Sequence, residues 1–539
     1  MKIRRLAALL VAAVLMVSVF TVSGCGSKVK LLPGQTAGYL HDWFTEDAGT
    51  FDFQEDTTLQ VYSLARELFN TLVRYKGDTL ELEPELLAEM PTVDESKTVY
   101  HFKLKPNVKF HDGTVLTSKD VKFTMERMLD PNGKGASAWL FEPIKGAKDI
   151  EDKKTTELAG FKIISDTEFE ITLEKPYAPF IQNLAVPSAS ILPEKACKAA
   201  GDKWAQQPIG TGPFKLAKYE PNNLIVLQKN PDYFEPGLPK LPGIDYVILP
   251  DSATGLMNFE KGSLDVAGVS GDDLKRIESL KDSKGQPKFN ILKSTPLNTY
   301  YLVFNMKEPA FKDVRIRKAI AMAIDKQKMV ENVINGEGTV AKAFVTPGIP
   351  GAYAAGTGPA YDYNPEEAKR LLAEAGVKDL KITLWQRGGQ QVSNGNIAIQ
   401  GFLKEIGITA DIQIIDRAVF SEARSKGTVP ANYGNWWADI PDPDNYLYTY
   451  FYPKNSMSTN YNNPKVTALL DQGRIETDPA KRAAIYQEAE RIIVQDDVAI
   501  VPLFHYDQYL AVQPTVKGVI MHPSGVNSYK TVEKAKGAK

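Results

Sequence analysis

Apolar and polar residues alternate over several short stretches of the chain, as expected for β-strands. Residues 99–104 show partial period-two alternation, and residues 169–173 alternate strictly. Residues 224–227 and 300–304 are continuous apolar or aromatic runs, which predict strands that are buried on both faces. These stretches are separated by segments with helical periodicity, so the pattern predicts a mixed α/β fold.

Helix starts are marked more clearly than strands. Asn364-Pro365, Asn463-Pro464 and Asp478-Pro479 each place an N-cap residue directly before a proline that suits the first helical turn. Residues 117–120 form a predicted capping box. The apolar faces that follow identify the predicted core positions: Val121, Met125, Met128, Ala368, Leu371, Leu372, Ala375, Val466, Leu469, Leu470, Ile485, Ala489, Ile492 and Ile493. Gly376 is the predicted stop of the helix that begins at Pro365.

The N-terminus has the pattern of an export signal. Lys2, Arg4 and Arg5 precede an apolar run of about 15 residues, and the run ends in Val22-Ser23-Gly24-Cys25. This ending resembles a bacterial lipobox, in which the cysteine is acylated and becomes the new N-terminus. The alternative, an uncleaved membrane anchor, needs about 20 apolar residues. We therefore expect residues 1–24 to be a lipoprotein signal peptide and Cys25 to carry the lipid, so that the protein is exported and faces the periplasm or cell exterior.

The net charge and the cysteine content narrow the possible class of protein further. Removal of residues 1–24 takes away three basic residues and no acidic residue, which changes the formal charge from −2 to −5. That balance argues against nucleic acid as a partner. With Cys25 acylated, Cys197 is the one remaining cysteine, so no intramolecular disulfide can form. At this length a large hydrophobic core can supply the stability instead.

The sequence offers little catalytic or cofactor chemistry. None of the five histidines is paired at helical spacing, and there is no Cys-x-x-Cys, Gly-x-Ser-x-Gly or Walker A motif. Gly210-Thr211-Gly212-Pro213 is glycine-rich, but the proline removes an amide that a phosphate loop needs, so a tight backbone crossing is predicted instead. The 66 acidic residues provide many chance carboxylate pairs, which leave a glycosidase open without supporting one. We expect no catalytic residue, no metal and no cofactor, and a protein that is not an enzyme.

Several segments, in order along the chain, resemble the family 5 solute-binding proteins of ABC transporters, which include oligopeptide, dipeptide and nickel receptors. They are FKLKPNVKFHDGTVLTSKDVKFTMERMLDP at 102–131, GTGPFKLAKYEPNNLIVLQKNPDYF at 210–234, YLVFNMKEPAFKDVRIRKAIAMAIDK at 301–326, NPEEAKRLLAEAGV at 364–377, WWADIPDPDNY at 436–446 and VKGV at 516–519. Together they extend over nearly the whole chain beyond the signal.

The resemblance implies a two-lobed clamp like that of periplasmic binding proteins of type II, cluster C, with an additional third domain. Residues 25–54, 173–295 and 506–539 would form the discontinuous domain I, 55–172 the extra domain II, and 296–505 the second lobe, domain III. The chain would cross between lobes near 297–301 and 503–506. Ligand would bind between the lobes, and hinge closure would bury it.

The resemblance also implies site residues. Asp439 matches the acid that pairs with a peptide's amino terminus, and Arg387 matches the arginine that binds its carboxylate in dipeptide receptors. The alternatives are a turn residue for Asp439 and a surface arginine at a strand end for Arg387. Asp442 and Asp444 are stronger candidates for turn residues. Gly388-Gly389 replace bulkier residues there, which leaves the peptide length open. Trp436 is expected to flank the pocket, although strand alternation predicts that only one of Trp436 and Trp437 lines the cleft. Tyr300 is a candidate backbone contact or an ordinary sheet aromatic, and His505 is expected to be an interlobe residue.

These features predict a monomeric lipoprotein that captures di- or oligopeptides and delivers them to an ABC permease and ATPase complex. Alternatives with the same fold bind a nickel chelate or an oligosaccharide. An alternative of another class is a secreted hydrolase of cell-wall material, and a sensor or chaperone role is a further one.

Overall fold

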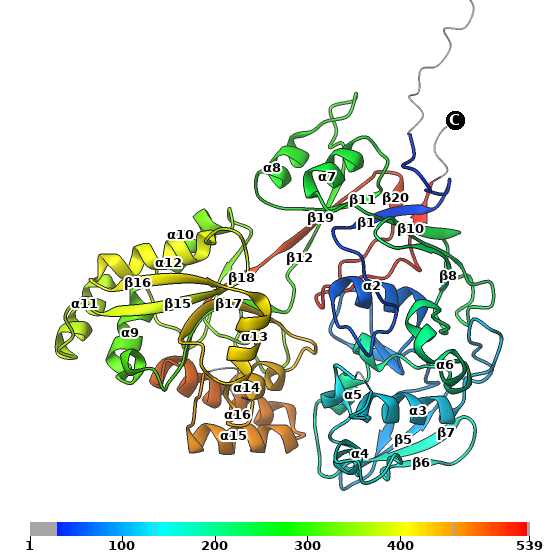
Figure 1. Ribbon diagram of the computed structural model, residues 1–539, viewed down its shortest axis with the longest axis horizontal. Coiled ribbons are helices and arrows are strands. Elements are labelled where there is room, and N and C mark those ends of the chain that lie inside the picture. The colour runs from blue at the N-terminus through cyan, green and yellow to red at the C-terminus, as the bar shows by residue number, and fades with distance from the viewer. Residues whose placement is uncertain (1–29, 134, 456–458, 536–539) are drawn as a thin grey trace, which may run out of the picture.

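The computed structural model describes residues 30–133, 135–455 and 459–535, and it shows two bodies side by side (Figure 1). We call residues 30–294 and 508–535 the first lobe and residues 298–506 the second lobe. The fold is mixed α/β, as the sequence predicted. The signal segment and Cys25 lie outside the described residues.

Two sheets form the upper part of the first lobe in Figure 1. One has the strand order β1-β10-β9-β8, with β1 parallel to β10 and the other neighbours antiparallel. The other has the order β11-β19-β12 and is antiparallel. Their bounds are β1 Leu40–Phe44, β8 Phe214–Glu220, β9 Leu224–Lys229, β10 Gly243–Ile248, β11 Val266–Val269, β12 Asn290–Ser294 and β19 Gln508–Val512. The first lobe also contains α2 Leu59–Leu68, α5 Phe180–Asn183, α6 Glu194–Ala200, α7 Ser252–Glu260, α8 Gly271–Ser279, and the strand pairs β2 Val73–Tyr75 with β3 Leu82–Pro84 and β20 Val516–Lys517 with β21 Glu533–Lys534.

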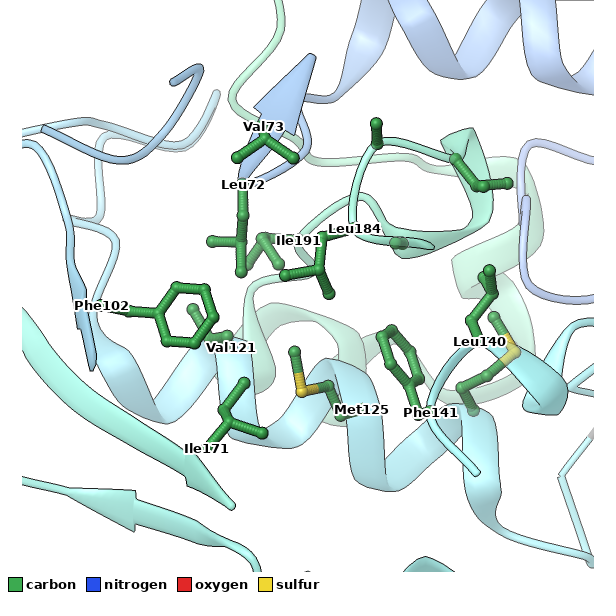
Figure 2. Close-up of a cluster of buried hydrophobic side chains, with 14 of the residues drawn as sticks. Leu72, Val73, Phe102, Val121, Met125, Leu140, Phe141, Ile171, Leu184 and Ile191 are labelled. Carbon is green, nitrogen blue, oxygen red and sulfur yellow. The ribbon is translucent and has the colours of Figure 1, made fainter. Parts of the chain in front are cut away.

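A separate antiparallel sheet, in the order β4-β5-β7-β6, forms the lower part of the first lobe in Figure 1. Its strands are β4 Thr92–Val93, β5 Val99–Lys103, β6 Phe161–Ile163 and β7 Glu168–Thr172, and α3 Ser118–Leu129 and α4 Ala147–Glu151 accompany it. Figure 2 shows its core, where Val121 and Met125 of α3 lie among Phe102, Phe141 and Ile171. The predicted inward face of this helix and both predicted strands are confirmed.

The glycine-rich segment that follows α6 is a close backbone crossing, as predicted. A β-carbon on Gly210 would lie 2.1 Å from the carbonyl oxygen of Leu68, and one on Gly212 would lie 2.3 Å from the carbonyl carbon of Leu68. The Gly212 amide donates to that same carbonyl oxygen (3.0 Å). Only glycine allows this approach, because any side chain would collide with the end of α2.

The second lobe is built on an antiparallel sheet in the order β14-β18-β13-β17, and the parallel pair β15 and β16 lies beside β17. The strands are β13 Asn298–Phe304, β14 Gly338–Val340, β15 Lys381–Arg387, β16 Thr409–Ile415, β17 Ala431–Trp437 and β18 Ile500–Tyr506. The helices are α9 Val314–Ala323, α10 Lys326–Val333, α11 Pro365–Glu374, α12 Asn394–Glu405, α13 Arg417–Ser425, α14 Pro443–Phe451, α15 Pro464–Ile475 and α16 Pro479–Arg491.

The helix starts predicted from the sequence are confirmed in this lobe. The side chain of Asn364 accepts the amide of Glu367 (3.1 Å), that of Asn463 accepts Lys465 (3.0 Å), and that of Asp478 accepts Lys481 (2.9 Å). Gly376, just beyond α11, has a φ of +70° and so ends that helix in the left-handed conformation.

The chain passes between the lobes at two adjacent places. One connection is 295–297, between β12 and β13, and the other is Asp507, between β18 and β19. The Asn298 side chain ties them together, since its amide donates to the Tyr506 carbonyl (2.9 Å) and its oxygen accepts the Tyr506 amide (3.0 Å). The three-domain division, with its boundaries, stays a prediction. Within the described ranges, no helix is long and apolar enough to cross a membrane.

Candidate functional site

A cavity of about 340 Å³ lies between the two lobes, a size typical of small-molecule binding sites. The second lobe contributes Trp437, Ala438 and Asp439 to its lining. The first lobe contributes Thr57, Leu59, Tyr62, Arg66, Tyr75, Ala185, Val186, Pro187, Gln508, Ser524, Gly525 and Val526. Two smaller cavities, of about 210 and about 280 Å³, share lining residues with it and so extend it along the first lobe.

The backbone around Asp439 is held firmly where β17 ends. The Ala438 amide donates to the Leu297 carbonyl at the interlobe connection (2.8 Å). The Asp439 amide donates to the side-chain oxygen of Asn445 on α14 (3.1 Å). These bonds position the Asp439 side chain at the cavity, while Ile440 beside it packs into the hydrophobic core of the first lobe.

The Asp439 side chain is exposed to solvent in the cavity that it lines. Partial removal of water by the surrounding protein raises its pKa from 3.8 to about 6, and a hydrogen bond from the Asn445 side chain opposes the rise. Its charge also acts on Tyr62 of the first lobe, because burial and then Asp439 raise the pKa of that phenol. In the described part of the chain no lysine, arginine or histidine forms an ion pair with Asp439.

The two aspartates just beyond it have structural roles, as their turn-like sequence predicted. Asp442 caps α14 by accepting the Asp444 amide (2.9 Å) and forms a bidentate pair with Arg482 (2.8 and 2.7 Å). Asp444 accepts a hydrogen bond from the Tyr486 hydroxyl (2.8 Å). Of the three acids in this segment, Asp439 alone lines the cavity.

The two adjacent tryptophans lie on opposite sides of β17, which confirms the predicted alternation. Trp437 lines the cavity. Trp436 packs edge-on against Tyr450, with ring centroids 5.2 Å apart, and borders the core of the second lobe. Its indole nitrogen has no hydrogen-bond partner among the described residues. A role for Trp436 beside the ligand stays a prediction.

Tyr300 and His505 lie within the second lobe and not at the cavity. Tyr300 stacks on Phe504 at 4.7 Å and neighbours Tyr433 and Tyr506. The His505 ring nitrogen Nδ1 lies 3.0 Å from the Asn298 carbonyl oxygen, and burial lowers its pKa to about 4. These contacts match ordinary sheet packing for Tyr300, whose role in binding stays a prediction.

Arg387 lies at the exposed end of β15 and does not line this cavity. Its loop is organised by Gln386, whose amide donates to the Gly388 carbonyl (3.1 Å) and whose oxygen accepts the Ser393 amide (2.8 Å). Gly388 and Gly389 have φ values of +64° and +96°, so the glycine pair is required by this turn. The structure therefore does not bring Arg387 and Asp439 to one cavity, and the role of Arg387 stays a prediction.

Sequence reasoning missed the first-lobe wall of the cavity. Tyr62 and Arg66 lie one turn apart on α2, so they share a face, and both line the cavity. An arginine one turn from a tyrosine on a helix is common on protein surfaces. Nothing in the local sequence signals that this face meets the second lobe.

Comparison with known proteins identifies the family to which the chain belongs. Residues 81–458 match the family model of the bacterial extracellular solute-binding proteins, family 5 Middle. The chain belongs to this family. Its fold is therefore the two-lobed clamp with a third domain that the sequence predicted.

The relatives of this chain are named for different solutes. The periplasmic oligopeptide-binding protein OppA of Salmonella typhimurium is 29% identical over 435 residues, which is 78% of this chain and 79% of that protein. Heme-binding protein A of Haemophilus influenzae is 28% identical over 487 residues, 86% of each chain. The structure of DppA from Helicobacter pylori in complex with the peptide STSA has a TM-score of 0.76 and 26% identity. It covers 92% of this chain and 98% of that one.

Proposed function

We propose that this protein captures short peptides between its two lobes and delivers them to the permease and ATPase of an ABC importer. The observation that carries the proposal is Asp439, an ionisable acid at the interlobe cavity with no cationic partner among the described residues. A carboxylate without a paired cation is suited to a ligand ammonium group, which would form an ion pair with it.

The remainder of the cavity suits a peptide with varied side chains. Gln508, Ser524 and Thr57 offer polar groups, and Val186, Val526 and Trp437 offer apolar surface. The adjoining cavities leave space for side chains with water around them, which lets one site accept many residues. Binding contacts to both lobes would favour the closed form of the clamp.

The ligand carboxylate has two candidate partners. Arg387 is supported by the resemblance to dipeptide receptors, and Arg66 is supported by its place in the same cavity as Asp439. Both arginines present a planar fork that can bind both oxygens of a carboxylate.

The alternative ligands keep the fold and the transport role. Heme-binding protein A shows that a relative of similar length is named for a solute that is not a peptide. A nickel chelate or an oligosaccharide would have no need of Asp439 as a partner for an ammonium group. A hydrolase would show turnover of its substrate, whereas we expect the peptide to be recovered intact.

A thermal-shift screen of the purified protein tests the function. The panel contains di- to pentapeptides, their N-acetylated forms, nickel chelates, hemin, and cello- and xylo-oligosaccharides. A ligand at a hundredfold excess over its Kd adds about 2.7 kcal/mol to the free energy of unfolding. We expect a shift with free peptides that is lost on N-acetylation. A shift with only sugar, hemin or nickel would disprove peptide capture.

We further propose that Cys25 anchors the exported protein to the membrane through lipid, as the sequence predicts. Replacement of Cys25 by serine in the producing bacterium should move the protein from the membrane fraction to the soluble fraction. A protein that stays with the membrane after this change would contradict the lipid anchor.

A further inference from the structure

Arg66 has an unusual environment for an arginine between two lobes. Its side chain is only 15% exposed, and its nearest acid is Glu85, with 4.0 Å between the guanidinium and the carboxylate. That separation is too long for a hydrogen bond. Among the described residues, no acceptor forms a hydrogen bond with its five N–H groups. These donors instead face the central cavity and its neighbour, both of which Arg66 lines.

Arg74, on the nearby strand β2, is by contrast an arginine whose charge is paired within the protein. Its Nε donates to Glu83 (2.8 Å), and its Nη1 pairs with Glu235 and lies 3.5 Å from Glu85. These three carboxylates satisfy its charge. Arg74 therefore stabilises the first lobe, whereas the N–H donors of Arg66 are available to a ligand in the cavity.

A second donor lies beside Arg66 without a partner. Tyr75 is only 8% exposed and lines the same two cavities, and its hydroxyl has no hydrogen-bond partner in the described chain. Burial raises the pKa of this phenol, and the positive charge of Arg66 opposes the rise. An anionic ligand group that accepts from both would satisfy two donors that the protein leaves open.

The charges of the cavity are arranged with one sign on each lobe. Among the lining residues that the structure describes, Asp439 of the second lobe is the one carboxylate and Arg66 of the first lobe is the one cation. The cavity therefore matches a small ligand with a positive group at one end and a negative group at the other.

We propose that Arg66, assisted by the Tyr75 hydroxyl, binds the terminal carboxylate of the peptide whose amino terminus pairs with Asp439. The inference rests on the proposed function and names the carboxylate partner within it. One zwitterionic ligand then connects α2 of the first lobe to the end of β17 in the second. Because each lobe holds one end, the full set of contacts exists only in the closed clamp, and the ligand favours closure.

The test compares tri-alanine with its C-terminal amide by calorimetry. For the wild type we expect the free acid to bind about 10- to 100-fold more tightly than the amide, the range expected for a hydrogen-bonded charge pair. In Arg66→Gln this preference should fall to about one, because the variant loses affinity for the acid alone. Arg66→Lys should restore part of the preference, since it keeps the charge without the fork.

The control is Arg74→Gln, which removes a neighbouring arginine whose charge is already paired. It should keep the preference for the free acid even if its thermal stability falls. A preference that survives in Arg66→Gln but disappears in Arg387→Gln would overturn the inference and leave peptide capture intact. Failure of the wild type to bind tri-alanine or any peptide of the panel would overturn both.

Discussion

The two walls of the interlobe cavity present opposite charges but are built in different ways. On the second lobe, Asp439 follows a strand, where the Ala438 amide donates to the Leu297 carbonyl and the Asp439 amide donates to the Asn445 side chain. On the first lobe, Arg66 belongs to the last turn of an amphipathic helix whose opposite face is buried. A polar residue in a turn after a strand belongs to a recognisable sequence motif. A polar residue on a helix face has the same sequence pattern as any solvent-exposed helix position. One wall of an interlobe cavity can therefore consist of ordinary helix positions.

The strongest test of this comparison is Asp439→Asn. We expect peptides with a free amino group to lose about 2–5 kcal/mol of binding free energy, the cost of removing one partner of a buried charge pair. Without ligand, the same variant should unfold at a higher temperature at pH 7. The reason is that a carboxylate whose pKa is raised from 3.8 to about 6 destabilises the folded state once it ionises.

Calorimetry and thermal unfolding measure these two effects. Asp411→Asn, an exposed acid on β16 of the same lobe, is the matched control and should change neither quantity. Unchanged peptide affinity in Asp439→Asn would remove Asp439 from the site.

The two tryptophans sharpen the comparison because they separate binding from stability. Trp436→Ala should lower the free energy of unfolding by about 2–3 kcal/mol, since it removes a ring packed against the second-lobe core. Trp437→Ala should leave stability nearly unchanged and cost about 1–2 kcal/mol of binding. Denaturant unfolding and calorimetry on both variants check this. The reverse pattern would mean that Trp436 is the ligand contact.

The pH dependence of binding tests the charge on the second-lobe wall. Below pH about 6, protonation of Asp439 competes with the ligand ammonium, so affinity should fall by up to about tenfold per pH unit. Tyr62 and Tyr75 also line the described cavity, and burial raises the pKa of both phenols further above this pH range.

Asp42, in the adjoining cavity, also has its pKa raised to about 6 by burial, so the wild type must be compared with Asp439→Asn. The variant should bind weakly and with little pH dependence in this range. An equal pH dependence in both proteins would assign the titration to another group.

The smallest effect is expected for Arg387→Gln. Arg387 is exposed and does not line the cavity, so we expect the affinity for tri-alanine to change by less than about threefold, equivalent to under about 0.7 kcal/mol. A loss of about 2–5 kcal/mol would instead support the role implied by the dipeptide receptors. Calorimetry on this variant beside Arg66→Gln decides between the two arginines.

The sequence alone determined the local structure and the family. Helix caps at Asn364, Asn463 and Asp478 are visible because capping depends on residues within one turn. The alternation of Trp436 and Trp437 follows from strand geometry, and the structural roles of Asp442 and Asp444 follow from turn chemistry. Asp439 could be named because the motif that contains it is contiguous.

Tertiary structure decided which face of α2 meets the second lobe and which arginine shares a cavity with Asp439. Arg66 and Arg387 are chemically identical, and their neighbours in sequence do not separate them. What separates them is that the chain crosses between lobes at 295–297 and Asp507, which sets α2 opposite the end of β17. That juxtaposition joins residues far apart in the chain, and packing of the whole fold, rather than any local pattern, fixes it.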